Sequence, residues 1–161
     1  MRSIRIETEI TEFENTGDLS REDQELVRAA REAAKASWSP YSGFAVGAAV
    51  RLVNGIVIQG CNVENAAFPS GICAEHNALS SAASLHPGIA PESIAVTAVA
   101  RGIPVEQPVS PCGKCRQIIA EEETRYRRSV RVIMAGTKSI RIISKGSDLL
   151  PLLFSGKDIR P

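Results

Sequence analysis

Apolar and polar residues follow two different periods along this chain, and each change of period marks a new element. From Ser20 to about Ser37 the apolar residues keep helical spacing, so that one face of a helix can be buried. Pro40 should end this pattern, because it cannot donate a backbone hydrogen bond and it restricts the residue before it. Ser20 followed by Asp23 predicts a capping box at the start of the helix. The apolar helical positions are Leu26, Val27, Ala30, Ala33 and Ala34.

The residues after Pro40 follow the period of β-strands. Two β-rich runs, Phe44 to Val53 and Ile56 to Cys61, flank Asn54-Gly55. This dipeptide is well suited to a two-residue turn with positive φ, so we expect a β-hairpin. Three further runs are typical of strands, and three further segments are typical of helices. The strand-like runs are 94–100, 130–135 and 139–144, and the helical segments are 73–85, 112–123 and 147–154.

The order of these elements predicts an α/β fold. Strands alternate with helices in the second half of the chain, which favours a mixed sheet with helices packed on its faces. Before the first helix, alternating apolar and charged residues predict a short strand or arm, followed by a turn. We therefore divide the chain into an N-terminal extension, residues 1–19, and one domain, residues 20–161.

Charge and composition exclude some kinds of partner. The 19 basic residues nearly balance the 18 acidic ones, so the chain lacks the overall positive charge typical of nucleic-acid binders. A small-molecule substrate fits this balance better, and we expect no nucleic-acid partner. Charged side chains interrupt residues 1–10, leaving no apolar run for a signal peptide or a membrane span. We therefore expect a cytoplasmic protein without a membrane partner.

Three cysteines have a spacing typical of metal ligands. Cys112 and Cys115 form a C-x-x-C pair where a loop should enter a helix, and Cys73 stands at another probable helix start. The free amides and dipole of a helix N-terminus lower the pKa of a thiol, which favours thiolate ligands. A catalytic zinc site keeps three protein ligands and leaves the fourth position to water, whereas a structural site is closed by four. Three well-placed cysteines therefore predict a catalytic zinc site.

The remaining candidates do not supply a fourth ligand. Cys61 ends a β run, and we expect it to be buried without a chemical role. Neither imidazole, His76 or His86, is expected to bind the metal. Glu75 lies two residues beyond Cys73. An isolated glutamate would be an exposed helical residue, but beside a zinc ligand this carboxylate can move protons between water and substrate.

These residues resemble a known family. Cys73-Ala74-Glu75 and the segment from Ser110 to Gln117 resemble the cytidine deaminases, in particular the small homotetrameric branch. Three other segments resemble that family's first strand, its nucleoside-binding loop and its C-terminal part, so the resemblance extends over roughly residues 20–160. Those segments are Pro40 to Ala49, Gly60 to Ala67 and Leu149 to Phe154.

The resemblance implies a fold, a metal and a reaction. The implied fold is a three-layer α-β-α sandwich with a central mixed five-stranded sheet. One zinc ion per subunit would be held by Cys73, Cys112 and Cys115, with Glu75 as the catalytic residue. The implied reaction is the hydrolytic deamination of cytidine or deoxycytidine to uridine or deoxyuridine plus ammonia, in pyrimidine salvage.

The resemblance also implies substrate contacts. Asn62 and Glu64 would bind the ribose hydroxyls, and Phe44 would pack beside the base. Phe154 would be lent to the active site of a neighbouring subunit, which implies a homotetramer with shared sites. Without the resemblance, the Asn62 segment would be an Asx-type loop, and Phe154 would be packing in an amphipathic terminal helix. The full set of implied substrate-binding residues is Phe44, Asn62, Glu64, Ala74, Ser110 and Phe154.

Two positions depart from the family pattern. His76 stands where the family usually has arginine, and Phe68 stands where it often has tyrosine. Three thiolates leave a zinc site with a net charge of about −1, which nearby positive charge or hydrogen-bond donors must offset. We expect His76, Lys114 and Arg116 to tune the charge of the thiolates, although Lys114 also fits a solvated loop position.

Three alternative functions remain open at this point. Blasticidin S deaminases share the zinc and glutamate motifs and also lack the usual arginine. A deaminase of polynucleotides is suggested by the basic residues of segment 125–145, but near-neutral charge and 4% aromatic content oppose it. A zinc module that only holds the fold is opposed by the three-ligand count and by Glu75.

Overall fold

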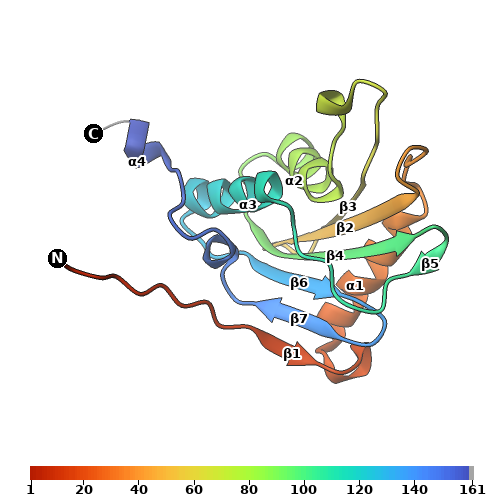
Figure 1. Ribbon diagram of the computed structural model, residues 1–161, viewed down its shortest axis with the longest axis horizontal. Helices are drawn as coiled ribbons and strands as arrows, with labels where there is room; N and C mark the ends of the chain where they lie inside the picture. Colours follow the sequence, from red (N-terminus) through yellow and green to blue (C-terminus); the bar gives the residue numbers. More distant parts are fainter. Residues whose placement is uncertain (160–161) are drawn as a thin grey trace.

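In the computed structural model, which describes residues 1–159, a β-sheet lies between helices on both of its faces (Figure 1). Strands β4 (Pro91–Ala100) and β6 (Arg131–Ala135) are parallel, and the other paired strands are antiparallel, so the sheet is mixed. The predicted α/β class with helices on a mixed sheet is confirmed. The sheet order is β1 (Thr11–Phe13), β7 (Ile140–Ile143), β6 (Arg131–Ala135), β4 (Pro91–Ala100), β2 (Phe44–Leu52) and β3 (Val57–Cys61), with β5 (Ile103–Pro104) paired to β4.

The expected number of strands is wrong. Within residues 1–159 the sheet has seven strands, and the five predicted runs correspond to β2, β3, β4, β6 and β7. Strand β5 has only two residues, too few for a periodic pattern. Strand β1 belongs to the N-terminal extension and pairs with β7, far away in the sequence. Its position depends on Glu12, which accepts hydrogen bonds from Ser139 Oγ (2.6 Å) and Arg141 Nε (3.0 Å).

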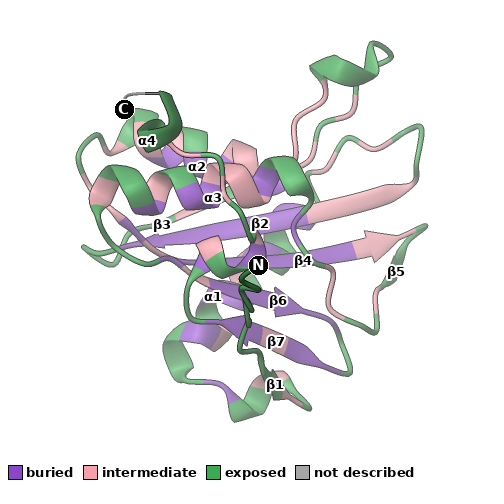
Figure 2. Cartoon of the chain, turned by 60° about the vertical axis from the view of Figure 1, so that its left-hand side comes forward, coloured by how far each residue is buried: buried purple, intermediate pink, exposed green. Residues whose placement is uncertain are grey.

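The helices form the outer two layers. Helix α1 (Arg21–Ala34) packs on one face of the sheet, while α2 (Ala74–Leu85) and α3 (Gly113–Tyr126) pack on the other. Figure 2 shows the buried residues concentrated on the central strands and on the helices that cover them. Short 3-10 turns complete the chain between these elements. They are η1 (Thr16–Asp18), η2 (Phe68–Ser70) and η3 (Gly146–Leu149).

Two glycines allow the helices to approach the sheet. A Cβ on Gly47 of β2 would lie 2.0 Å from the Ala30 carbonyl oxygen of α1. A Cβ on Gly60 of β3 would lie 2.4 Å from the backbone nitrogen of Ala78 in α2. Real Cβ atoms do not approach so closely, so a side chain at either position would push its helix away. Gly60 therefore determines how closely α2 packs on the sheet, and the N-terminus of α2 carries Cys73 and Glu75.

The start of α1 is only half of a capping box. The Ser20 hydroxyl accepts from the Asp23 backbone N–H (3.2 Å), as predicted. The Asp23 carboxylate does not reach back, because both of its oxygens bind the Arg131 guanidinium of β6 at 3.2 and 2.9 Å. The helix ends at Ala34, before the predicted end at Ser37, and tighter i to i+3 hydrogen bonds continue it to Ser37.

The hairpin between β2 and β3 is confirmed, but its turn differs from the prediction. The loop is closed by hydrogen bonds from Gly55 N to Leu52 O (2.8 Å) and from Leu52 N to Ile56 O (2.9 Å). Three residues therefore form the loop, and Gly55, with φ of 86°, is the one with positive φ. Asn54 keeps an ordinary φ, and its side-chain oxygen accepts from Ile56 N (3.2 Å).

The predicted helix over 147–154 is wrong. Turn η3 ends at Leu149, and Phe154 lies in a segment without regular structure before the short helix α4 (Gly156–Ile159). Pro151 explains the break, because the residue before a proline is pushed out of the helical region; Leu150 has φ of −132° and ψ of 78°. Residues 160–161 of the predicted domain lie outside the described residues. Within residues 1–159 no helix is long and apolar enough to cross a membrane.

Candidate metal centre and catalytic pocket

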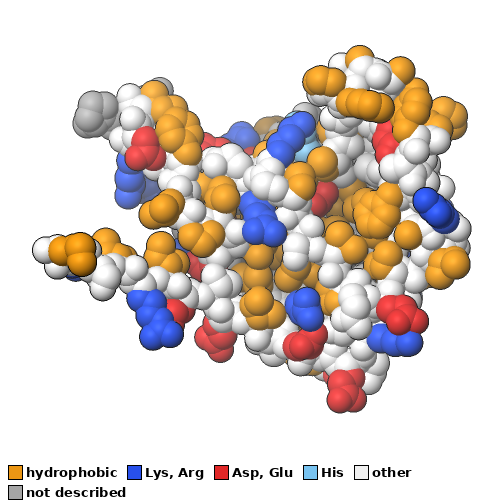
Figure 3. Space-filling view, viewed as in Figure 1, with side chains coloured by type: hydrophobic (Ala, Val, Ile, Leu, Met, Phe, Trp, Pro, Cys, Tyr) orange, Lys and Arg blue, Asp and Glu red, His pale blue; other side chains and the backbone are white. Residues whose placement is uncertain are grey.

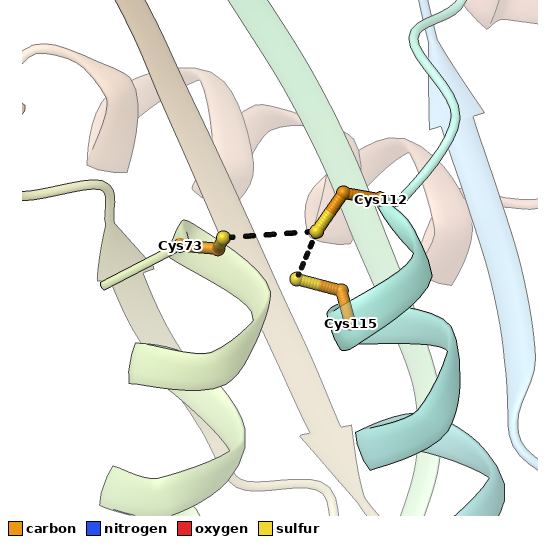
Figure 4. Close-up of side chains that lie close together, drawn as sticks. All are labelled: Cys73, Cys112 and Cys115. Atoms are coloured by element: carbon orange, nitrogen blue, oxygen red, sulfur yellow. Dashed lines mark hydrogen bonds between the residues drawn. The ribbon is translucent and has the colours of Figure 1, made fainter. Parts of the chain in front are cut away.

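Three cysteine thiols meet where α2 and α3 begin (Figure 4). Cys73 is the N-cap of α2, Cys112 is the N-cap of α3, and Cys115 lies in the first turn of α3. The Sγ atoms of Cys73 and Cys112 are 3.8 Å apart, and those of Cys112 and Cys115 are 3.5 Å apart. Ligands at about 2.3 Å from a tetrahedral zinc ion lie about 3.8 Å from one another. The spacing of the three thiols therefore fits a zinc ion.

The pKa values of the three thiols also favour a bound cation. Burial raises the pKa of Cys115 far above its usual range, and the negative charge of Glu75 raises it further. Burial likewise raises the pKa of Cys73. For Cys112, burial by itself would raise the pKa, but hydrogen bonds from the Cys115 backbone N–H and from both neighbouring thiols lower it overall. A divalent cation is the partner that allows all three sulfurs to become thiolates together.

Glu75 lies beside the cluster and is 4% exposed. Burial raises the pKa of its carboxyl, while hydrogen bonds from its own backbone N–H and from the Cys115 thiol act in the opposite direction. A carboxyl with a raised pKa can both accept and return a proton near neutral pH. Glu75 therefore has the environment of a general acid and base next to a metal site.

A cavity of about 650 Å³ opens beside these groups. This volume is within the range of sites for small organic molecules. Figure 3 shows hydrophobic side chains gathered on the loop between β3 and α2, which forms part of the rim. The predicted site residues that line the cavity are Phe44, Asn62, Glu64, Cys73, Ala74, Glu75, Ser110 and Cys112.

The side chain of Asn62 joins the segment after α1 to the start of β2. Its oxygen accepts from Ser37 Oγ (2.6 Å) and from Val46 N (2.7 Å), and its amide nitrogen donates to Phe44 O (2.9 Å). The second N–H of this amide remains available to a bound hydroxyl. Asn62 therefore holds the start of β2 in place in addition to facing the cavity.

The carboxylate of Glu64 is held by the turn before β2. It accepts from Tyr41 N (2.9 Å), Ser42 N (3.2 Å) and the Ser42 hydroxyl. The hydrogen bond from the Ser42 hydroxyl, assisted by the two backbone N–H groups, lowers the pKa of Glu64 despite the opposing effect of burial. An ionised carboxylate with three fixed donors keeps acceptor capacity for a further hydroxyl.

Sequence reasoning missed Ser42. Its hydroxyl donates to Glu64 and accepts from Phe44 N (3.0 Å), so it connects the cavity carboxylate to the first residue of β2. No period or spacing marks this serine, because its partner lies 22 residues away. Its position inside the segment Pro40 to Ala49, which resembles the family's first strand, was the only available signal.

Phe154 does not reach the cavity of its own chain. Its side chain is 61% exposed, and its carbonyl accepts from Gln117 Nε2 (2.9 Å). Of the predicted substrate-binding residues, five line the cavity and Phe154 lies outside it.

Cys61 does not belong to the metal cluster. It is half-buried, and its thiol donates a hydrogen bond to Ala36 O (3.3 Å).

The three residues expected to tune the thiolates have different environments. Arg116 donates from Nε to Pro111 O (2.8 Å) and from Nη1 to Leu149 O (3.0 Å), so its direct partners are carbonyls. Lys114 is exposed. Within residues 1–159 the buried Nδ1 of His76 has no hydrogen-bond partner.

The sequence of this chain is similar to those of known deaminases. Residues 20–131 match the family model of the cytidine and deoxycytidylate deaminase zinc-binding region. A protein named cytidine deaminase from Sporosarcina psychrophila is 40% identical over 99 residues, which are 61% of this chain and 68% of that protein. A second one, from Halalkalibacterium halodurans, is 41% identical over 98 residues, covering 61% and 70%.

A solved structure shares the fold. The crystal structure of cytidine deaminase from Burkholderia pseudomallei superimposes with a TM-score of 0.70 at 35% identity, covering 84% of this chain and 100% of that one. Because the matched region is a zinc-binding region and the three thiols are placed to hold a metal ion, the expected zinc cofactor is confirmed.

Proposed function

The chain belongs to the cytidine and deoxycytidylate deaminase family, and on that premise we propose that it hydrolyses cytidine and deoxycytidine to uridine and deoxyuridine with release of ammonia. The observation that carries this proposal is the meeting of three thiols and the buried carboxyl of Glu75 beside a cavity of about 650 Å³. The relatives that bear the name cytidine deaminase support the same reaction. Cys73, Cys112 and Cys115 would hold the zinc ion.

Zinc, when bound, would supply Lewis acidity that makes water a nucleophile near neutral pH. Glu75 performs the proton transfers, because its carboxyl is buried and its pKa is raised. It takes a proton from the attacking water and delivers it to the ring nitrogen N3, and then takes the second proton from the new hydroxyl on C4 and passes it to the amino group, which leaves as ammonia. Because Glu75 is 4% exposed, its carboxyl has little contact with bulk water, which favours proton exchange with the attacking water and the substrate.

The remaining cavity residues would bind the nucleoside. Asn62 and Glu64 present a donor and an ionised acceptor to the sugar hydroxyls, and Phe44 offers an apolar ring to the base. Once a bound nucleoside covers them, polar groups of this kind penalise substrates that lack the matching hydroxyl. Ala74 and Ser110 come from two other parts of the chain and complete the wall near the thiols.

A direct assay tests the proposed function. Conversion of cytidine to uridine changes the ultraviolet absorbance of the base, so purified protein with zinc should produce this change and release ammonia in equal amount. Absence of turnover with both cytidine and deoxycytidine, in protein that retains zinc, would exclude the proposal. A parallel assay with blasticidin S tests the first alternative function, deamination of blasticidin S. The relatives do not favour this alternative, because they bear the name cytidine deaminase.

The structure weakens the polynucleotide alternative. The basic residues of segment 125–145 have no acidic neighbours within that segment, but six of them form ion pairs with acidic residues elsewhere. Their charge is therefore neutralised locally and does not form a basic face for a phosphate backbone. The pairs are Arg125–Glu122, Arg128–Glu92, Arg131–Asp23, Lys138–Glu106, Arg141–Glu12 and Lys145–Asp148.

The assembly and the cellular location are part of the proposal. A homotetramer in which each chain lends Phe154 to a neighbour accounts for the exposure of this side chain and its distance from the cavity of its own chain. A role in cytoplasmic pyrimidine salvage fits the four cysteines, which all lie within residues 1–159 and are free thiols, as a reducing compartment requires.

A further inference from the structure

Residues 1–10 form an extended arm ahead of β1, and this arm projects from the body of the molecule (Figure 1). Every residue of the arm is exposed, including Ile4 (78%), Ile6 (54%) and Ile10 (51%). The arm touches the body through Thr8, whose hydroxyl donates to the Asp148 carbonyl (2.8 Å). Three exposed isoleucines in one short segment are costly in water, and the chain itself does not cover them.

The sheet ends where the arm would need a neighbouring strand. β1 pairs with β7 from Thr11 opposite Ile142 to Phe13 opposite Ile140. Beyond Ile143 the chain leaves β7 and turns into η3, so β7 offers no strand beside the arm. β1 is the last strand of the sheet in the described residues, and its outer edge is also free. An exposed edge strand that continues into an alternating apolar arm is a template for pairing with another chain.

The arm is complementary to a second copy of itself. In an antiparallel pair centred on Glu7, Arg5 faces Glu9 of the other copy, and Ile4 faces Ile10. The isoleucines gather on one face of the pair, and the charges gather on the other. At the centre the two Glu7 side chains face each other, and each has Arg5 of its own chain within 2.8 Å.

Other registers are less favourable. A slip of one residue sets isoleucines against charged side chains. A slip of two residues in one direction sets Arg2 against Ile10, and in the other direction it sets Glu7 against Glu9. The register centred on Glu7 sets one pair of like charges opposite each other, at Glu7 itself, but it is the one of these registers that forms two Ile4–Ile10 pairs together with two Arg5–Glu9 pairs.

We propose that the arms of two copies of this chain pair as antiparallel strands about a twofold axis at Glu7, so that residues 1–10 form an interaction surface for a second copy. Such a contact is isologous, because the same segment serves both chains. The contact lies outside the cavity and the metal cluster, and it is independent of the reaction. It also assigns a role to an extension that precedes the matched family region, which begins at residue 20.

Disulfide trapping tests the position of the axis. In the full-length Glu7→Cys variant the two new thiols lie opposite each other, so mild oxidation should give a cross-linked dimer. In the matched control Ser3→Cys, an equally exposed thiol faces Thr11 of the other copy, so cross-linking should be about tenfold lower. Wild-type protein, oxidised in parallel, measures the background from the native cysteines. Equal cross-linking of the two variants would overturn the proposal.

Charge reversal tests whether Arg5 faces Glu9 of the other copy. On the Glu7→Cys background, either Arg5→Glu or Glu9→Arg places like charges opposite each other and should lower the cross-linked yield about tenfold. Mixing these two variants restores opposite charges across the pair, so cross-linking between the two different chains should recover. The doubly reversed chain should recover as well. Yields that do not respond to either reversal, or a mixture that does not recover, would contradict the proposal.

Discussion

The carboxyl of Glu75 is the residue on which the proposed proton transfers depend. In Glu75→Gln the side chain keeps its size and the three thiols are untouched, so zinc content should stay at the level of the unmodified protein. Turnover of cytidine should fall by about a hundredfold to ten-thousandfold, because the amide cannot carry protons. Zinc analysis and the absorbance assay on one preparation check both results. A variant that keeps full turnover would assign the protons to another group.

Ser42 is expected to act as a positioning residue. In Ser42→Ala the Glu64 carboxylate loses its hydroxyl donor, so KM for cytidine should rise about tenfold while kcat changes little. Ser42→Thr keeps the hydroxyl and should restore KM. A cytidine analogue without sugar hydroxyls should show no difference between Ser42→Ala and the unmodified protein. An equal loss for cytidine and the analogue would indicate a purely structural role.

Lys114 lies between two metal ligands and is exposed. We expect its positive charge to stabilise the anionic cluster through solvent, so Lys114→Ala should weaken zinc retention about threefold at low ionic strength. The difference should shrink at high salt, which screens exposed charges. Competition with a chelator at two salt concentrations measures it, and Lys138→Ala is the control far from the cluster in sequence. Equal zinc retention at low salt would assign the charge compensation to other groups.

Close packing between helix α2 and strand β3 keeps the metal-binding residue Cys73 in position. Gly60→Ala would place a Cβ 2.4 Å from Ala78 N and 2.8 Å from Ala74 O. Helix α2 must move away, so unfolding free energy should fall by about 1–3 kcal/mol and zinc content should fall with it. Gly156→Ala is the matched control, because a Cβ there meets open space. Urea denaturation and zinc analysis compare the two, and a normal zinc content in Gly60→Ala would show that α2 can shift without disturbing Cys73.

The elements also show where periodic patterns succeed and fail. The pattern correctly predicted α1, the hairpin and the strands β4, β6 and β7, because α1 buries one face in the period of a helix and the strands are β-rich runs long enough to be visible in the sequence. It also predicted a short strand or arm within residues 1–19, where β1 lies, but it missed β5, which has only two residues and is too short to show a period. It also failed over 147–154, where an apolar run suggested a helix but Pro151 and the hydrogen bonds of η3 impose a turn.

At the scale of the whole molecule, shared active sites can be tested by mixing two inactive variants. Glu75→Gln and Phe154→Ala should each be nearly inactive alone. In hybrid assemblies some sites combine an intact Glu75 from one chain with an intact Phe154 from another, so activity should recover after dissociation and reassembly. Recovery requires a shared site, and a failure of mixed assemblies to regain activity would contradict it. Sedimentation analysis reports whether each variant assembles to the same size as the unmodified protein.

The sequence alone was sufficient to locate the three cysteines of the metal cluster and to predict most of the fold. Cys73, Cys112, Cys115 and Glu75 could be identified because their spacing places them at two helix starts, and helix starts are visible in local patterns. The alternation of β-rich and helical segments was sufficient for a mixed sheet covered by helices. These features depend on residues that are close together in the sequence, so they can be predicted from local sequence patterns.

Contacts between distant residues emerged only in three dimensions. Asp23 binds Arg131 instead of completing its capping box, Ser42 holds Glu64, and Glu12 fastens β1 to β7. Four basic residues of segment 125–145 find acidic partners far away in the sequence; they are Arg128, Arg131, Lys138 and Arg141. The reason is that a charge or a hydroxyl takes the partner that packing brings within about 3 Å, and packing depends on the whole sheet rather than on any local window.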